Sequence, residues 1–135
     1  TGMNIKPDTL TYLEKEDFKN IIVKHLEYGE KPIYDTEKIK GIDSYDVFLS
    51  GASSFIEIEN KNLSDGSTLI LFRDSFGSSI APLLTPYYNK IIMVDLRYID
   101  MNYAKEILDF EKADVLFLYS TLVINNSNIL KVNIK

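Results

Sequence analysis

The feature that most constrains the fold is an apolar run, Leu69–Phe72, that stops abruptly at Arg73-Asp74-Ser75 and is followed by residues typical of a helix start. Continuous hydrophobicity, without alternation, is typical of a strand buried on both faces in a parallel sheet that helices cover. In such sheets ligands bind outside the carboxyl ends of the strands. We therefore expect Ser75 to lie in a crevice, near the backbone N–H groups of a helix start.

Strand and helix patterns alternate from Thr68 onward. The predicted elements are a strand at 68–72, a helix at 77–84, a strand at 91–94, a helix at 103–110 and a strand at 115–118. Such alternation favours parallel pairing through right-handed crossovers. The sequence therefore predicts an α/β fold in three layers, with a mostly parallel sheet between flanking helices. An antiparallel edge strand is compatible with this pattern.

The pattern before residue 68 is mixed. Apolar residues at three- and four-residue spacing predict a helix over 16–28, with Gly29 as its C-cap. A short strand is predicted at 45–49. Residues 55–59 alternate apolar and charged side chains, which predicts a half-exposed strand, here placed at an edge of the sheet. The tail, residues 129–134, alternates again and predicts an exposed antiparallel strand.

Composition excludes several classes of function. A length of 135 residues fits a single domain, residues 1–135. The net charge of -5 argues against a nucleic-acid partner, whose phosphates need clustered Lys and Arg. The absence of cysteine excludes disulfides and thiolate metal sites. No apolar run approaches the roughly 20 residues that span a bilayer. No cofactor and no metal is predicted, and the sequence does not define an oligomeric state.

Three predicted parallel strands end in polar residues, and parallel strands place these ends on one edge of the sheet. Ser75, Arg97 and Tyr119 follow the three strands. A hydroxyl, a permanent cation and a phenol would then converge on one crevice. This combination is typical of a nucleophile with groups that stabilise charge on a substrate oxygen.

Each of these residues also has a purely structural interpretation. Ser75 is a good helix N-cap. Arg97 can pair with Asp95 or Asp100, and Tyr119 can be a core residue whose hydroxyl reaches solvent. The sequence alone leaves both interpretations open.

Two further sets of residues were weighed. His25, the only histidine, is the obvious base for a serine nucleophile, yet its place in the last turn of the predicted helix favours packing or an interaction with the helix dipole. Asp74 and Asp95 could hold magnesium in a receiver-like acidic pocket. That alternative lacks a clear acidic pair near the N-terminus.

Several motifs together resemble the C-terminal part of the DHHW protein family of Gram-positive bacteria, which are SGNH-hydrolase-like proteins related to the alginate O-acetyltransferases. The resemblance extends from about Gly41 to Ser120. The motifs that carry it are Tyr45–Gly51, Leu69–Gly77, Leu83–Tyr88, Val94–Tyr98 and Asp114–Tyr119.

The resemblance implies an SGNH- or flavodoxin-like fold and a serine esterase or O-acetyltransferase acting on acylated polysaccharide at the cell envelope or outside the cell. Ser75 matches the family's serine, and Arg97 and Tyr119 match polar positions beside it. Gly51, in the loop after the predicted strand 45–49, would help to bind substrate or the oxyanion. Arg73 stands where typical SGNH enzymes have glycine.

The Asp-His-His-Trp motif that names the family, and that supplies the base in its relatives, is absent from this sequence. The chain therefore resembles a truncated, C-terminal portion of a longer protein, inactive when isolated. The alternative is a non-catalytic binding or scaffold module that keeps the same fold.

Overall fold

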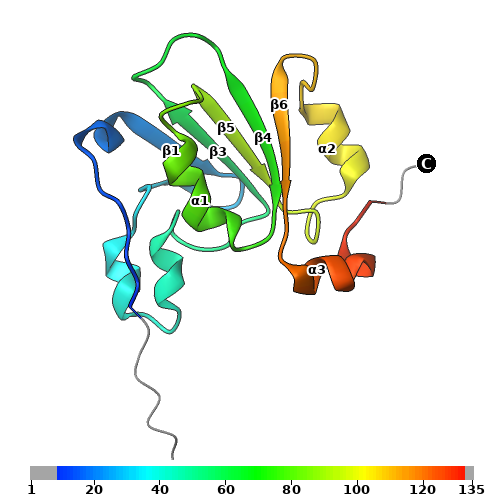
Figure 1. The fold of residues 1–135 in the computed structure, drawn as a ribbon, viewed down its shortest axis with the longest axis horizontal. Coiled ribbons are helices and arrows are strands. Elements are labelled where there is room, and N and C mark those ends of the chain that lie inside the picture. The colour runs from blue at the N-terminus through cyan, green and yellow to red at the C-terminus, as the bar shows by residue number, and fades with distance from the viewer. Residues whose placement is uncertain (1–8, 133–135) are drawn as a thin grey trace, which may run out of the picture.

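The computed structural model describes residues 9–132, which form a six-stranded sheet in the order β2-β1-β3-β5-β4-β6 with helices around it (Figure 1). The strands are β1 (Ile21–His25), β2 (Gly29–Lys31), β3 (Phe55–Asn60), β4 (Thr68–Arg73), β5 (Lys90–Val94) and β6 (Ala113–Leu118). The α-helices are α1 (Gly77–Leu84), α2 (Met101–Ile107) and α3 (Thr121–Asn125). The short 3-10 helices are η1 (Glu16–Asn20), η2 (Thr36–Lys40), η3 (Ser44–Val47) and η4 (Ser127–Ile129).

The sheet is mixed, which corrects the prediction of a mostly parallel sheet. β5, β4 and β6 are parallel neighbours, as predicted. The pairs β1–β2, β1–β3 and β3–β5 are antiparallel. Parallel strands need a long crossover between them, whereas β1 and β2 are joined by a tight turn at Gly29, which has a φ of 73°. The α/β class is confirmed, and an antiparallel edge strand is present, but it is β2, a segment for which no strand was predicted.

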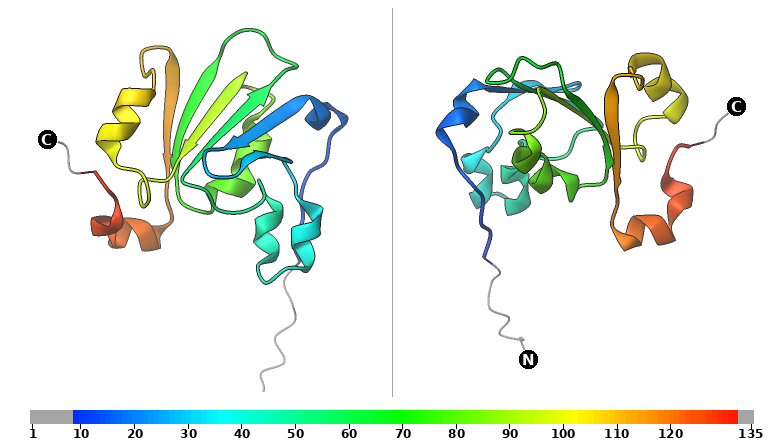
Figure 2. Two further views of the ribbon diagram at one scale, coloured as in Figure 1. Left: turned by 180° about the vertical axis from the view of Figure 1, so that it is seen from behind. Right: turned by 45° about the horizontal axis from the view of Figure 1, so that its top comes forward.

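Helices cover both faces of the parallel strands. Alternate residues of β4 point to opposite sides, so Leu69 and Leu71 pack in one apolar cluster with Ala81 of α1. Ile70 and Phe72 pack in a second cluster on the other face, with α2 residues. The right-hand view of Figure 2 shows α1 and α2 on opposite sides of the sheet. β4 is thus buried on both faces, as its continuous hydrophobicity predicts.

The predicted helix over 16–28 is wrong. That segment forms η1 and then β1, in which Val23 and His25 point into the core and Lys24 points out. The apolar residues at 21–23 are β-branched and fit a pleated surface well. Hydrogen bonds to β3 and β2 satisfy the backbone, so tertiary pairing overrides the helical spacing.

Other predictions need smaller corrections. The strand expected at 45–49 is instead η3, although Phe48 forms a single bridge with Tyr34. β3 exists and alternates in burial as predicted, but it lies inside the sheet between β1 and β5 rather than at an edge. The face that carries Glu57 and Glu59 is only partly exposed.

The C-terminal part also differs from the prediction. α2 ends at Ile107 rather than at residue 110, and α3 was not predicted. Instead of a strand, the described part of the tail contains η4 at Ser127–Ile129. Residues 133 and 134 of the predicted strand lie outside the described residues. Between residues 9 and 132, no helix combines the length and hydrophobicity needed to cross a membrane.

The strand assignment of residues 21–25 predicts a contrast between two truncations. Val23→Ala should lower the free energy of unfolding by about 2 kcal/mol, because it removes two buried methyl groups and leaves a small cavity. Leu26→Ala should change it by less than about 0.5 kcal/mol, since Leu26 is 61% exposed. Urea unfolding of both variants measures the difference. A larger loss for Leu26→Ala would support the helix instead.

Candidate active site at the carboxyl edge of the sheet

The carboxyl ends of the three parallel strands lie side by side, as the sequence predicts. Phe72, near the end of β4, is opposite Val94 of β5 and Phe117 of β6. The residues that follow these strands therefore share one edge of the sheet. The structure does not, however, place all of the predicted residues in one cavity.

Ser75 lies exposed in the turn between β4 and α1. Asp74 holds this turn: one carboxylate oxygen accepts the Phe76 N–H at 3.0 Å and the other accepts the Ser120 N–H at 2.7 Å. Phe76, not Ser75, occupies the N-cap position of α1, and no side chain caps the helix there. Within residues 9–132 the Ser75 hydroxyl forms no hydrogen bond, so the N-cap interpretation of Ser75 does not hold.

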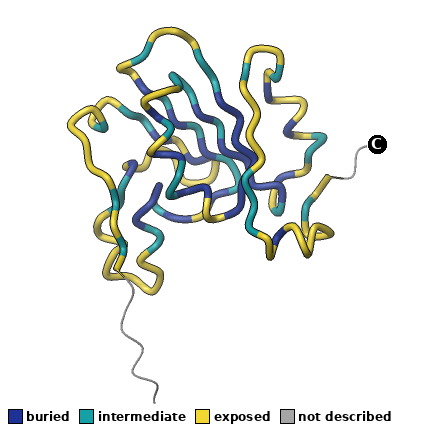
Figure 3. Tube along the Cα trace, viewed as in Figure 1, coloured by how far each residue is buried: buried dark blue, intermediate teal, exposed yellow. Residues whose placement is uncertain are grey.

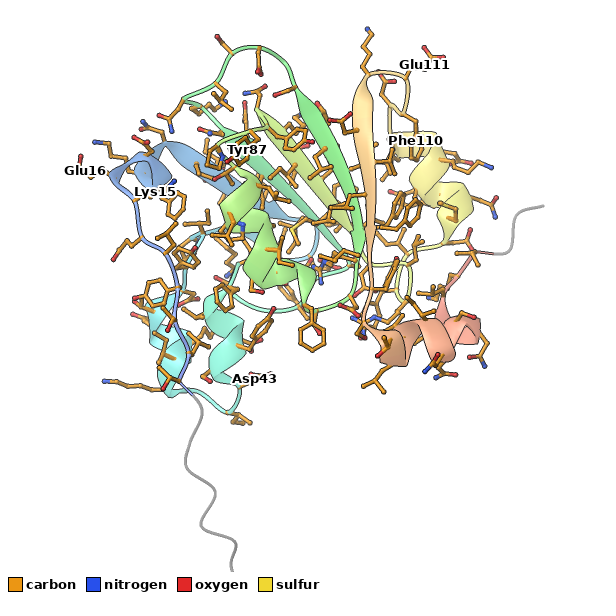
Figure 4. The ribbon with its side chains drawn as sticks, in the orientation of Figure 1. Lys15, Glu16, Asp43, Tyr87, Phe110 and Glu111 are labelled. Carbon is orange, nitrogen blue, oxygen red and sulfur yellow. The ribbon has the colours of Figure 1, made fainter. Side chains whose placement is uncertain are left out.

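A cavity of about 270 Å³ opens next to Ser75. It is lined by Asp43, Tyr45, Asp46, Phe48, Gly51, Ala52, Ser75, Phe76 and Ser78. The Tyr45 hydroxyl donates to the Phe76 carbonyl at 3.1 Å and so joins η3 to the Ser75 turn. Asp43, labelled in Figure 4, precedes η3 and also lines the cavity. The structure thus brings together two of the predicted residues, Ser75 and Gly51.

The loop at residues 49–51 has an unusual backbone. Leu49, Ser50 and Gly51 have φ angles of 54°, 58° and 100°, all in the left-handed region that favours glycine. A Cβ atom on Gly51 would lie 2.9 Å from the Asp46 carboxylate, so a side chain there would have to displace that carboxylate. The Gly51 N–H donates to the Phe48 carbonyl at 3.1 Å, whereas the neighbouring Ala52 N–H has no hydrogen-bond partner in the described chain. Ala52 is thus the freer backbone donor.

Arg97 does not line this cavity. Its Nε donates to one oxygen of Asp95 at 2.9 Å and its Nη2 to the other at 2.6 Å. These hydrogen bonds raise the pKa of Arg97 above its ordinary value. The guanidinium also lies 5.4 Å from the centre of the Tyr98 ring. The pairing of Arg97 with Asp95 is therefore confirmed, and a direct role toward substrate stays a prediction.

Arg73 is the residue that the sequence interpretation missed. Its side chain is fully buried at the end of β4 and donates to the Ser53 carbonyl at 3.0 Å. Its Nη1 lies 3.8 Å from the Asp95 carboxylate. Burial lowers the pKa of Arg73, and the charge of Asp95 opposes this shift. A charged residue directly after an uninterrupted apolar run was the available signal.

Gly77 makes room for the buried arginine. A Cβ atom there would lie 2.6 Å from Cβ of Arg73, far inside van der Waals contact. Gly77 is the first residue of α1, so this close approach sets how near the helix lies to the end of β4. The arginine thereby influences where the Ser75 turn is held.

Tyr119 follows β6 and is only partly buried, but its hydroxyl is inaccessible and has no hydrogen-bond partner among residues 9–132. Loss of solvation, together with the negative charges of Asp95 and Asp74, raises its pKa to about 12. The phenol therefore keeps its proton at neutral pH. Tyr119 does not line the Ser75 cavity, so its predicted role beside the serine stays a prediction.

His25 is buried at the end of β1, and neither ring nitrogen has a hydrogen-bond partner in the described residues. Burial lowers its pKa, although the Leu49 carbonyl and Glu27 act in the opposite direction. His25 does not line the Ser75 cavity. The chain therefore places a neutral imidazole in the core rather than a base beside the serine.

The carboxylates weighed as a magnesium site are engaged by the protein itself. Asp74 binds two backbone N–H groups, and Asp95 binds Arg97 and lies close to Arg73. In the described part of the chain, no group of three or more His, Cys, Asp or Glu side chains is arranged to hold a metal ion. The receiver-like alternative gains no support from this geometry.

Comparisons with solved structures define the class of fold. The protein is similar to Bacillus cereus PatB1 solved with a sulfonyl adduct, with a TM-score of 0.61 and 23% identity over 96% of this chain and 44% of that chain. A second PatB1 structure gives a TM-score of 0.52 and 23% identity over 84% of this chain and 37% of that chain. The chain thus has an α/β fold that resembles part of PatB1.

The family follows from the sequence. The model of the DHHW protein family matches residues 1–94, so this chain belongs to the DHHW family. A crystal structure of a DHHW family protein from Eubacterium siraeum is also similar, with a TM-score of 0.54 and 22% identity over 82% of this chain and 39% of that chain. Ser75 and Gly51 lie inside the family match, whereas Arg97 and Tyr119 lie outside it.

The chain spans less than half the length of these solved chains. A search of curated proteins found no match.

The buried ion pair predicts a large effect of a single charge removal. Asp95→Asn should lower the free energy of unfolding by about 3–5 kcal/mol, because it leaves the Arg73 charge buried without a counter-charge. Glu57→Gln is the matched control: Glu57 pairs with Lys90 at 3.5 Å on the surface, and its loss should cost less than about 1 kcal/mol. Equal losses of unfolding free energy in chemical denaturation would show that the buried ion pair contributes no more to stability than the surface pair.

The buried histidine predicts how stability depends on pH. Because the pKa of His25 is lower in the folded protein than its unfolded value of 6.5, the unfolded state binds more protons below that pH. Its contribution to stability is present above pH 6.5 and is lost as the pH falls below it. His25→Leu should therefore flatten the decline in melting temperature between pH 8 and pH 5. An unchanged decline would mean that His25 titrates normally.

Proposed function

We propose that this chain is part of an SGNH-like serine esterase or O-acetyltransferase that acts on acylated polysaccharide at the cell envelope or outside the cell. Ser75 is the proposed nucleophile. The observation that carries the proposal is an exposed serine hydroxyl, free of internal hydrogen bonds, in the strand-to-helix turn beside a cavity of about 270 Å³.

In this proposal the Ser75 hydroxyl attacks the acyl carbon and transfers its proton to a base. The carbonyl oxygen becomes an oxyanion that needs hydrogen-bond donors. Ala52 lines the cavity and its N–H has no partner in residues 9–132, so this N–H is the proposed donor, while Gly51 shapes the loop before it. The oxyanion then collapses and breaks the bond to the original alcohol, which leaves with the proton from the base, and an acyl-enzyme remains. Water or a sugar hydroxyl attacks the acyl-enzyme, takes the acyl group and returns the proton to Ser75 through the base.

Arg97 and Tyr119 keep a proposed role in orienting substrate. Arg97 binds Asp95 through Nε and Nη2, so Nη1 remains for a ligand oxygen. The Tyr119 phenol is protonated at neutral pH and can donate a hydrogen bond once an acceptor comes within reach. Both groups stand beside Asp95, at the same sheet edge as Ser75.

The base is proposed to come from an Asp/His pair outside this chain. His25 is the chain's only histidine, and it is buried away from the serine cavity. The family resemblance supports a base that comes from outside this chain, because the motif that names the family lies upstream of the serine. The sulfonyl adduct of the similar PatB1 structure supports a nucleophile of the kind that sulfonyl reagents trap.

A second candidate is a non-catalytic binding or scaffold module with the same fold. The observation that favours it is the Ser75 hydroxyl itself, which has no base within hydrogen-bond reach in residues 9–132. A serine without a base is a poor nucleophile. Such a module would bind polysaccharide without turning it over.

Covalent labelling separates the two candidates. A sulfonyl fluoride should modify Ser75 in the longer polypeptide that contains this chain, and peptide mass spectrometry locates the adduct. Ser75→Ala should abolish labelling and lower the hydrolysis of an acetyl ester by at least about 10³-fold. Ser78→Ala is the matched control, because Ser78 lines the same cavity but should leave labelling unchanged.

Equal labelling of the wild type and Ser75→Ala would overturn the assignment of the nucleophile. An unlabelled, inactive wild type that binds polysaccharide would favour the binding module.

A further inference from the structure

β6 has the sequence of an interior strand but the position of an edge strand. Its residues include Val115, Leu116 and Phe117, an uninterrupted apolar run. Such runs are typical of strands that are buried on both faces. Yet these three side chains are 43%, 39% and 57% exposed. Figure 3 shows the trace of β6 as mostly exposed, in contrast with the buried strand β4 beside it.

The exposed apolar side chains of β6 point to both faces of the sheet. Phe117 lies opposite Phe72, and the two rings stack with centres 4.8 Å apart on the face that α2 covers. Leu116 lies opposite Leu71, on the face that α1 covers. A strand that ordinarily faced solvent on one side would carry polar residues at one of these two sets of positions.

The outer edge of β6 has little of the usual protection, because Asp114 is its one charged residue. β6 is six residues long and pairs with β4 alone in the described chain. The opposite edge strand, β2, is three residues long and carries Glu30 and Lys31. Short length and charge prevent unwanted pairing at sheet edges. β2 is therefore built as a true edge, whereas β6 is not.

The apolar surface continues beyond β6. Ile107 of α2 and Leu122 and Ile124 of α3 are exposed as well. Figure 1 shows both helices next to β6, on the side away from β1. Contiguous apolar surface of this kind marks an interaction site on a soluble domain. We call β6 together with these three residues the β6 surface.

We propose that the outer edge of β6 pairs with a β-strand from the remainder of the DHHW-family polypeptide, so that β6 is an interior strand of a larger sheet. The PatB1 chain solved with a sulfonyl adduct is covered over only 44% of its length by this chain, so more than half of a polypeptide of that length is available to supply the strand. The partner segment should be apolar on both faces, because it continues the two apolar layers that β6 leaves open.

The receiving edge is already held in place. The Ser120 N–H, just after β6, binds the Asp74 carboxylate at 2.7 Å, and all six residues of β6 are in register with β4. An ordered edge loses little conformational freedom when a strand is added, which favours pairing. Because Asp74 precedes Ser75, the added strand would also stand next to the serine turn. The proposal itself does not depend on catalysis.

Hydrogen exchange provides the direct test. In the longer polypeptide, the amides of residues 113–118 should exchange at least about tenfold more slowly than in the 135-residue chain. The amides of β2 serve as the internal control and should not change. If the short chain proves too unstable, the comparison within the longer polypeptide suffices, where β6 should be protected like β4 and not like β2. Protection of β6 no greater than that of β2 overturns the proposal.

A matched pair of variants gives a second test. Leu116→Glu should lower the melting temperature of the longer polypeptide by several degrees more than that of the 135-residue chain. Ile39→Glu, on η2, is the control, since Ile39 is 38% exposed and lies away from the β6 surface. An equal, small effect of Leu116→Glu in both polypeptides would contradict the proposal.

The competing occupant is a second copy of this chain. In that case light scattering would detect a dimer of the longer polypeptide, and Leu116→Glu would dissociate this dimer. That result would overturn the proposal of an intramolecular strand. A monomeric longer polypeptide with protected β6 amides supports the proposal. A reading frame that encodes no further strand would also overturn it.

Discussion

The burial of Arg73 beside Asp95 is the interaction on which the rest of this edge of the sheet depends. A guanidinium without access to water is costly unless a carboxylate and hydrogen-bond acceptors surround it. Asp95 supplies the opposite charge after β5, and the Ser53 carbonyl accepts a hydrogen bond from the loop before β3. The ends of three strands are thereby tied to one side chain. Asp95 also fixes Arg97, so two cations share one buried anion.

Asp74 extends this arrangement toward the candidate nucleophile. Its two carboxylate oxygens join the start of α1 to Ser120, the second residue after β6. Ser75 lies between these anchors, and its hydroxyl forms no hydrogen bond within residues 9–132. A rigid turn that presents a free hydroxyl agrees with the requirement that catalytic groups be held by their neighbours rather than by their own hydrogen bonds. The left-handed loop at Gly51 completes the cavity from the other side.

Sequence patterns predict best the elements that pack against other elements close to them along the chain. The strand–helix units from residue 68 to residue 118 were predicted in type and order, with bounds that differ from the structure by up to three residues, and the shared edge of their strands was predicted as well. Residues 21–25 were mispredicted because apolar residues at helical spacing are here also β-branched. Only the presence of β3 and β2 on either side makes the strand the more stable choice.

The sequence by itself determined the α/β class, the buried strand β4, the place of Ser75 in the turn after that strand and the likeness to the DHHW family. These features depend on local hydrophobicity, turn residues and motifs, all of which are present in the linear sequence. Tertiary structure alone decided that the sheet is mixed, that His25 is buried away from Ser75, and that Arg97 is held by Asp95. It also decided that Gly51 meets Ser75 across a cavity. These outcomes depend on pairings between distant segments, where burial and charge compensation outweigh local preference.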